Sequence, residues 1–347
     1  MKFTSRKKEI LKQVILNFIE KAEPVSSQVL TENLKNEISS ATIRNEMAEL
    51  EEMGYLSHPH TSAGRIPTDS GYRYYIDNVI FGEEKSKINE QNQMIPLNLP
   101  VNREMDLDTI LRLSTETLSK FTNYLSMIVA PEINQSRFRH IEVLKFESND
   151  YLFVLITDSG RVYKKKFSTE GEYNDLDLQR VTNILNSQAR NILIREISFK
   201  NTVKIDENDK YLVFLINRII DLIKGCEENL NSYNRIFIRG TFSIFRDPEF
   251  LDLSKVKKIV EVLENEYLLM NIMLNYSGKD DISVKIGSEI HGDETDDLSL
   301  IASKYKIKGS SPGSIGVLGP KRMNYLKIIN ILSSFSDSLS NLLSYKT

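Results

Sequence analysis

The sequence predicts a multidomain α+β protein, and three observations support this fold class. Its 347 residues are enough for two to three domains of roughly 100–200 residues each. The first 82 residues have the pattern of three helices followed by a strand, a turn-rich loop and a returning strand. Blocks of helix and strand patterns then alternate to the end. With 40% hydrophobic residues the chain can bury a core, which excludes wholesale disorder.

Charge, cysteine content and hydropathy narrow the class further. The formal net charge of −3 argues against a chain that coats nucleic acid by bulk charge, but leaves room for a local DNA-binding surface. The one cysteine, Cys226, cannot form an internal disulfide, which excludes a disulfide-framed secreted scaffold. No apolar run reaches the ~20 residues that span a bilayer, and no cleavage site follows the basic start. We therefore expect a soluble, cytoplasmic protein.

The N-terminal helices are predicted from apolar spacing and from residues that cap or stop helices. Apolar side chains from Ile10 to Ile19 recur at helical spacing and predict an amphipathic helix of about 16 residues. A short second helix and a third from about Ala41 to Met53 follow. Their boundaries are marked by Pro24, by Ser26 or Ser27, by Ser39 or Ser40, and by Gly54.

Two short strands and a loop complete this first domain. Residues 55–56 and 65–66 have strand patterns around the turn-rich loop 58–64, and Thr68 or Asp69 caps a further helix. The order helix, helix, helix, strand, loop, strand is typical of a winged helix-turn-helix, which places a helix in the major groove. We assign residues 1–82 to this domain and the polar segment 83–103 to a linker.

The remaining residues predict one α+β domain interrupted by a mainly helical insertion. Strands are predicted at 139–147, 151–157, 161–167, 234–239, 270–275, 283–286, 298–305 and 316–318, and helices at 107–127, 176–193, 211–230, 254–267 and 323–343. The tight turn 158–160 predicts a hairpin between the second and third of these strands. We expect residues 104–170 and 232–347 to form the two parts of the interrupted domain, and 171–231 to form the insertion.

The third helix has a face suited to a DNA groove. At 100° per residue, Ile43, Met47 and Leu50 form its buried stripe. The outer side carries small residues with one arginine and one asparagine: Ala41, Thr42, Arg44, Asn45 and Ala48. Arg can bond guanine through two donors, Asn can do the same with adenine, and a methyl group can touch thymine. The same pattern also fits an ordinary solvated amphipathic helix.

Positive charge in the first domain is concentrated at its start. Residues 1–82 hold ten basic and eleven acidic groups, a net of −1. Residues 1–12 alone hold five basic groups against Glu9, a net of +4, and include Lys7 and Lys8. We therefore expect phosphate contacts at the chain start, at the start of the third helix around Ser40, and in the 58–65 loop.

Several irregular motifs resemble the HrcA family of heat-inducible transcription repressors. The resemblance is carried by residues 40–56 and 59–75, by 23–27, and near the C-terminus by 286–289, 298–299 and 316–325. It extends from about residue 5 to 343. The resemblance implies a winged-helix domain, a GAF-like domain and an inserted dimerisation subdomain at 171–231.

The family resemblance also implies a function and a set of contact residues. Such proteins bind as homodimers to an inverted-repeat operator, the CIRCE element, upstream of chaperone operons, and the GroEL chaperonin is thought to maintain the active bacterial repressor. Motif matching adds Thr42, Arg44 and Asn45 on the helix and His60, Thr61, Ser62 and Arg65 in the wing. An alternative is a winged-helix regulator controlled by a small ligand in the GAF-like domain.

Other motifs favour no catalytic, cofactor or metal site. His58 and His60 could chelate a metal, or form a polar wing, but no third ligand is apparent nearby. The acidic segment 291–297 lacks EF-hand spacing, and the glycine-rich segment 309–320 lacks a Gly-Lys-Ser/Thr motif. Cys226 has no visible activating partner. We therefore expect a regulator that is not an enzyme and holds no cofactor.

Overall fold

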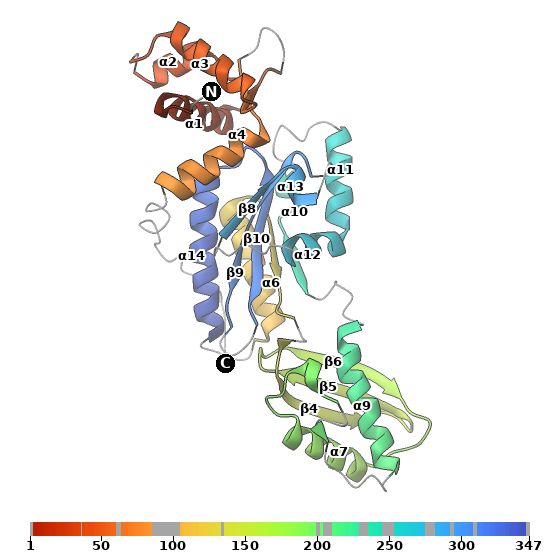
Figure 1. Ribbon diagram of the computed structural model, residues 1–347. Coiled ribbons are helices and arrows are strands. Elements are labelled where there is room, and N and C mark those ends of the chain that lie inside the picture. The colour runs from red at the N-terminus through yellow and green to blue at the C-terminus, as the bar shows by residue number, and fades with distance from the viewer. Residues whose placement is uncertain are drawn as a thin grey trace.

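The protein consists of three bodies arranged along one long axis (Figure 1). The computed structural model describes residues 3–35, 37–59, 64–84, 105–132, 135–198, 202–203, 210–228, 235–244, 253–274, 282–291, 295–307 and 311–344. The N-terminal helices lie at one end, a five-stranded sheet with flanking helices lies in the middle, and a smaller sheet with two helices lies at the other end. Across the described residues, none of the helices combines the length and apolarity needed to cross a bilayer.

The N-terminal body has the order of elements that the sequence predicts. It comprises α1 (Ser5–Lys21), α2 (Ser27–Asn33), α3 (Ser40–Glu52), β1 (Leu56–Ser57), β2 (Ile66–Pro67), α4 (Asp69–Tyr74) and the π-helix η1 (Tyr75–Glu83). Side-chain oxygens of Ser26, Ser39 and Thr68 accept hydrogen bonds from the first turns of α2, α3 and α4. Each pair of alternative caps is thereby resolved in favour of the earlier residue. The helical run reaches Glu83, one residue into the expected linker, and residues 85–104 lie outside the described part.

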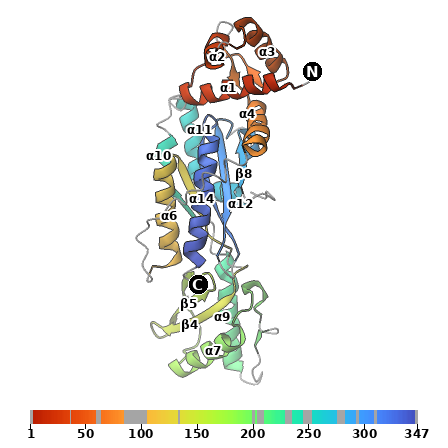
Figure 2. The ribbon, with the colours of Figure 1, turned by 90° about the vertical axis from the view of Figure 1, so that its left-hand side faces the viewer.

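The central body is an antiparallel sheet covered on both faces. Its strand order is β7 (Ile236–Arg239), β3 (Leu125–Val129), β10 (Gly313–Pro320), β9 (Leu298–Tyr305) and β8 (Ile282–Ile286). Helices α6 (Leu107–Thr122) and α14 (Tyr325–Ser344) pack on one face, and α10 (Thr241–Ile244), α11 (Leu253–Glu264) and α12 (Glu266–Leu274) lie on the other (Figure 2). The short α13 (Ser288–His291) follows β8. The strand predicted at 316–318 is confirmed as part of β10, in which Ile315 and Val317 are buried.

Two predicted elements of the central body are wrong, for related reasons. The helix predicted over 107–127 ends at Thr122, where Asn123 takes a left-handed conformation with φ 59° and caps it. The strand β3 that follows is buried on both faces, so its side chains show no clear alternation. The strand predicted at 270–275 is part of α12, because Leu268, Leu269 and Ile272 face the sheet at helical spacing.

The third body contains strands as well as helices, which corrects the expected boundary. Strands β4 (Phe138–Lys145), β5 (Asp150–Thr157) and β6 (Val162–Ser168) pair only with one another among the described strands. They share a separate core with α7 (Asp175–Gln188) and α9 (Lys210–Glu228), and η3 (Ile194–Glu196) lies between these helices. We call this body, from β4 to α9, the insertion. We predicted that residues 104–170 belong to the central domain and that 171–231 form a mainly helical insertion. The boundary between them is wrong, because β4, β5 and β6 belong to the insertion and not to the central sheet.

Side-chain contacts explain why these strands leave the central sheet. Tyr151, Phe153 and Leu155 alternate along β5 and pack into the core shared with α7 and α9. Asn186 of α7 accepts a hydrogen bond from the Ile141 amide at 2.8 Å and donates one to the Ile141 carbonyl at 3.0 Å. The helix is thereby fixed to β4. The predicted tight turn at 158–160 is confirmed, with Gly160 at φ 77° between β5 and β6.

Ion pairs and one aromatic contact join the N-terminal body to the central body. Arg73 of α4 forms an ion pair with Glu289 of α13 and donates to the Val284 carbonyl at 2.7 Å. Asp69 lies 2.6 Å from the Lys321 ammonium. The ring centroids of Tyr72 and Tyr325 are 5.8 Å apart. The N-terminal body is therefore held against the central sheet through α4.

Candidate nucleic-acid interface

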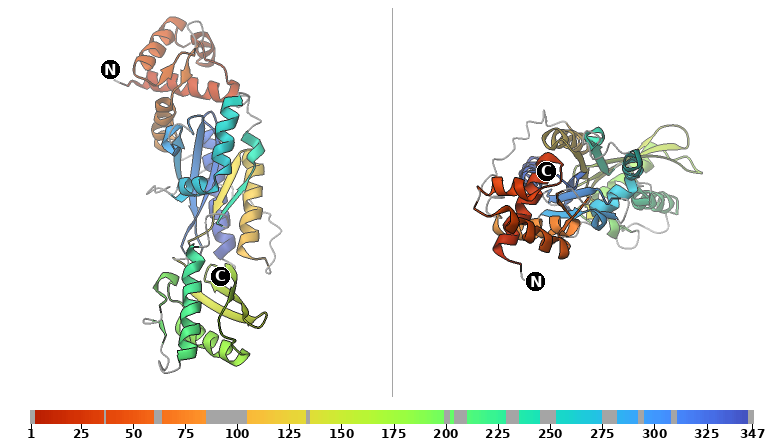
Figure 3. Two further views of the ribbon diagram at one scale, coloured as in Figure 1. Left: turned by 90° about the vertical axis from the view of Figure 1, so that its right-hand side faces the viewer. Right: turned by 90° about the horizontal axis from the view of Figure 1, so that it is seen from above.

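Helix α3 lies at the outer end of the molecule, away from the central sheet. Figure 3 shows α2 and α3 above α1, with the central body and the insertion below. The predicted buried stripe of α3 is confirmed, since Ile43, Met47 and Leu50 are at most 3% exposed. The opposite side of the helix faces solvent at Ala41, Arg44 and Asn45. The first two turns of α3 therefore present an accessible surface of small and polar side chains.

The turn between α2 and α3 is held by short polar contacts. The hydroxyl oxygens of Ser27 and Ser40 are 2.9 Å apart and connect the starts of the two helices. The Ser39 hydroxyl accepts from the Thr42 amide at 3.2 Å and also lies 2.9 Å from the Thr42 hydroxyl. Ser40 is thus half-buried and engaged within the protein, whereas Thr42 is partly exposed at the start of α3.

Arg44 and Asn45 are exposed polar side chains in the first half of α3. Within the described part of the chain, neither side chain forms a hydrogen bond or an ion pair, and both are exposed. Their spacing places them side by side on the outer face, one helical step apart. A guanidinium and a carboxamide in this position can bond the edges of bases in a major groove.

The basic start of α1 has a different environment from the one predicted. The Lys7 side chain is only 7% exposed, and its ammonium lies 2.6 Å from Glu49 and 3.1 Å from Glu46 of α3. Hydrogen bonds to Glu49 and then Glu46 raise the pKa of Lys7. Arg6 lies 3.7 Å from Glu46 at the edge of the same group. Lys7 therefore links α1 to α3 inside the domain.

The next two lysines of α1 pair with the end of η1. Lys8 forms an ion pair with Glu83, and Lys12 lies 3.0 Å from Glu84. The positive charge of residues 1–12 is therefore largely balanced by carboxylates elsewhere in the N-terminal body. Lys7 and Lys8 are therefore engaged in ion pairs rather than free, and their contact with phosphate stays a prediction.

The wing is described at its base. The main chain of Arg65 forms two hydrogen bonds of 2.9 Å with Val25, in the α1–α2 connection. A side chain at Gly64 would collide with the Val25 backbone, so glycine permits this close approach. His58 and Arg65 both contact Glu51 of α3. The predicted wing residues His60, Thr61 and Ser62 lie outside the described residues.

Sequence reasoning missed the structural role of Glu51 and Val25. Glu51 lies beside the buried stripe of α3, eight residues after Ile43, and so faces the hairpin rather than solvent. An acidic residue at this position, followed by His58 and Arg65 around a turn-rich loop, was a usable signal for a contact. The Val25 contact had no such signal, because it depends on how the α1–α2 connection packs.

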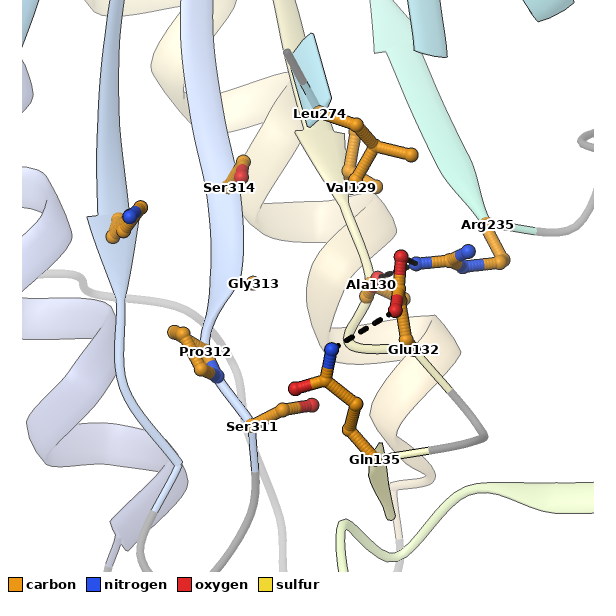
Figure 4. A pocket seen from close by; sticks show the side chains of 11 residues that line it. Val129, Ala130, Glu132, Gln135, Arg235, Leu274, Ser311, Pro312, Gly313 and Ser314 are labelled. Atoms are coloured by element: carbon orange, nitrogen blue, oxygen red, sulfur yellow. Dashed lines mark hydrogen bonds and ion pairs between the residues drawn. The ribbon is translucent and has the colours of Figure 1, made fainter. Parts of the chain in front are cut away.

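A pocket in the central body is one candidate place for the small ligand of the alternative hypothesis. It has a volume of about 230 Å³, and Arg235, Glu132, Gln135 and Ser311 lie around it at the ends of β3 and β10 (Figure 4). Arg235 donates to the Ala130 carbonyl at 3.2 Å and lies 3.9 Å from Glu132. Gln135 donates to Glu132 at 3.1 Å. Burial lowers the pKa of Arg235, and Glu132 opposes this shift.

The polar atoms around this pocket are mostly directed at one another. Among the described residues, Arg235 Nε and Ser311 Oγ have no hydrogen-bond partner, but both atoms are shielded from solvent. A ligand in the pocket would therefore have to displace existing contacts to reach them. Among the described residues, no group of three His, Cys, Asp or Glu side chains is placed to hold a metal ion.

Comparison with known proteins identifies the family. The family model described as "HrcA protein C terminal domain" matches residues 108–329. Proteins named "Heat-inducible transcription repressor HrcA" from Thermoanaerobacter sp. and Natranaerobius thermophilus are 36% and 33% identical to this chain. The matches cover 99% and 100% of this chain, respectively, and 98% of each relative.

A solved structure has the same fold over its whole length. A crystal structure described only as that of a hypothetical protein aligns with a TM-score of 0.63 at 26% identity, covering 100% of both chains. The family model covers the motif at 316–325, and the full-length relatives also span the motifs at 40–56 and 59–75. The chain therefore belongs to the HrcA family, whose curated members are named as heat-inducible transcription repressors.

Proposed function

We propose that this protein represses transcription by binding, as a homodimer, to an inverted-repeat operator of the CIRCE type upstream of chaperone operons. The observation that carries this proposal is the outer face of α3, where Arg44 and Asn45 are exposed and have no partner among the described residues. Family membership supplies the regulatory role. Arg44 would bond a guanine and Asn45 an adenine, and Thr42 and Ala41 would contact thymine methyl groups.

The charges around α3 are compatible with approach to DNA. Four acids lie in the second half of this helix, and by count they would repel phosphate. Three of them are compensated within the domain, since Glu46 and Glu49 flank Lys7 and Glu51 contacts the wing. Arg65 and the wing residues 60–62 are proposed to contact the backbone beside the groove.

The insertion supports the proposal of a homodimer. Its sheet buries one face against α7 and α9, and the other face carries Leu152, Val154 and Ile156 along the central strand. Beside them on the edge strands Leu144 is 49% and Val162 41% exposed. The other neighbours on this face are Glu142, His140, Lys164 and Lys166, so an apolar centre with a polar rim is the surface proposed for a second copy of the chain. Two winged helices related by a two-fold axis would read half-sites spaced by whole turns, on the order of 34 Å per turn.

A gel shift tests the operator proposal directly. Purified protein should bind an inverted repeat of CIRCE type more tightly than a scrambled duplex of equal length and composition, at each of several salt concentrations. Equal affinity for both duplexes at every salt concentration would reject specific repression.

Dimerisation has its own test at the open sheet face. Replacing Val154 with Lys should shift the protein toward monomer in sedimentation and weaken operator binding, because it places a charge in the proposed interface. Lys164 of β6 pairs with Val154. The control Lys164→Glu changes the charge at the same place without removing an apolar side chain, so it separates the loss of apolar contact from the effect of charge. An unchanged dimer in Val154→Lys would place the interface elsewhere.

The heat response is proposed to depend on the GroEL chaperonin. The chaperonin would raise the operator-competent fraction, and unfolded proteins would compete for it on heating. A titration of purified repressor with chaperonin, followed by operator binding, tests this step. A thirtyfold shift would correspond to about 2 kcal/mol of coupling. If the competent fraction is unchanged at all ratios, and heating alone abolishes binding, the protein senses temperature directly.

A further inference from the structure

One carboxylate connects the recognition helix to both sides of the wing. Glu51 lies in the last turn of α3, and its two oxygens have different partners. One is hydrogen-bonded to Nδ1 of His58, which follows β1. The other lies 2.8 Å from Nε of Arg65, which precedes β2. The side chains of Glu51, His58 and Arg65 are 29%, 32% and 17% exposed, so the contact is partly shielded from water.

The two partners of Glu51 occupy equivalent places on the hairpin. Ser57 pairs with Ile66, so His58 and Arg65 are the next residues outward on the two strands. Beyond them the chain continues into the tip of the wing. A single side chain of α3 therefore contacts both chain segments at the point where they enter the tip.

Other contacts fix the inner end of the hairpin. The Thr68 hydroxyl donates to the Gly54 carbonyl at 2.6 Å, and the Thr68 amide donates to Tyr55 at 3.1 Å. Arg65 is bonded through its main chain to Val25. Backbone contacts thus set the position of the two strands. The Glu51 contacts in addition fix the side chains of His58 and Arg65, which lead into the tip.

We propose that Glu51 is a positioning residue for the wing, which sets where the wing contacts DNA relative to the bases read by α3. This inference rests on the proposed DNA-binding function. Nε of Arg65 lies within ion-pair distance of the Glu51 carboxylate, and we expect the two terminal nitrogens of the same guanidinium to contact the phosphate backbone. A wing held in one position binds most tightly to DNA whose phosphates reach it while α3 contacts its preferred bases. A loose wing would contact any duplex equally well.

The test compares Glu51→Ala with Glu52→Ala in the full chain. Glu52 is the next residue of α3, is exposed, and makes no ion pair among the described residues. Both variants remove one negative charge from the same turn, so both should raise affinity for scrambled DNA by a similar factor. Only Glu51→Ala is expected to lower the ratio of operator affinity to scrambled-DNA affinity, by about five- to tenfold. Equal ratios in the two variants would overturn the inference.

A second comparison separates positioning from simple charge and from misfolding. Arg65→Ala should lower the same ratio, and adding Glu51→Ala to it should lower the ratio no further, because the two residues act through one contact. If Glu51→Ala unfolds the domain at the assay temperature, Glu51→Gln decides the question, since it keeps the side-chain shape and is expected to lower the ratio to a smaller extent. A Glu51→Gln ratio equal to that of Glu52→Ala would then overturn the inference. Loss of discrimination already in the unmodified protein would instead reject the proposed function.

Discussion

The starts of α1 and α3 differ in how their polar side chains are used. The first turns of α1 carry four of the ten basic residues of the domain, yet Lys7, Lys8 and Lys12 among them all form ion pairs within it. The start of α3 carries a single arginine, and Arg44 is exposed with no partner among the described residues. The number of cations in a segment therefore does not measure how many are free to meet a phosphate.

The difference follows from the faces on which the charges lie. Lys7 is on the side of α1 that packs against α3, where Glu46 and Glu49 are three residues apart and share a face. Lys8 and Lys12 are one turn apart and face η1. Asn45 lies on the side of α3 opposite its buried stripe and Arg44 on the flank of that side, and neither pairs with an acid of the described residues.

The largest effect on operator binding is expected at Arg44, which has no partner among the described residues. Arg44→Ala should weaken operator binding by about 1–3 kcal/mol and relax base preference at one position in each half-site, because it removes a two-donor contact. Arg44→Lys is the matched variant, which keeps the charge and loses the paired donors. Binding assays with single-base operator changes would measure both. Equal losses on operator and scrambled DNA would mean that Arg44 contacts phosphate only.

Buried Tyr75 of η1 should make stability fall at alkaline pH. Burial raises its pKa to about 12 from the ordinary value of 10.0. Below pH 10 the Tyr75 hydroxyl is neutral in both states and does not change the free energy of unfolding. Between pH 10 and 12 this free energy falls, because Tyr75 ionises in the unfolded state but not in the folded state. At pH 11 the loss is about 1.4 kcal/mol.

Unfolding curves at pH 9 and 11 would measure this loss. Tyr75→Phe should show a smaller pH dependence than the unmodified protein, since no hydroxyl remains to ionise. Tyr267→Phe, at a 61% exposed position, is the control and should leave the pH dependence unchanged. The same alkaline loss in Tyr75→Phe would contradict the assignment.

Lys7 is paired within the domain, so Lys7→Met should lower the stability of the protein and leave the salt dependence of DNA binding unchanged. The change removes the ammonium that pairs with Glu46 and Glu49 and leaves Glu46 with Arg6 at 3.7 Å, and we expect a fall of roughly a few degrees in melting temperature. The pKa of Lys7 is raised, so its contribution is present below the ordinary lysine pKa and is lost as pH rises through the higher folded value. The slope of DNA affinity against salt should stay unchanged; a slope reduced by about one would show that Lys7 reaches phosphate.

The smallest effect is expected for Lys8→Ala. Its partner Glu83 is 63% exposed, and such surface pairs contribute about 0.2–1 kcal/mol. We therefore expect a change in unfolding free energy near the lower end of that range and no change in the salt slope. Chemical unfolding together with a salt titration would check both. A reduced slope would restore Lys8 as a phosphate contact and weaken the distinction between α1 and α3.

Local patterns predicted the N-terminal body well, whereas sheet membership required the structure. The stripe of Ile43, Met47 and Leu50 and the caps at Ser39 and Thr68 depend on residues within a few positions of one another. The strand β3 was missed because it is apolar on both faces. The β4–β6 strands were correctly located along the chain, but their neighbours could not be read from it.

The sequence by itself determined the order of elements in the N-terminal body, the buried stripe of α3, and the motifs that indicated the HrcA family. These depend on helical spacing, capping and residue identity along a continuous segment. Only the tertiary structure decided that Lys7 is engaged, that Glu51 contacts both sides of the wing, and that β4–β6 form a separate core. Each of these features depends on contacts between elements that are separated along the chain. Tertiary packing determines which of their side chains come into contact. Net charge along a sequence records none of those pairings, so it cannot show which cations remain free for DNA.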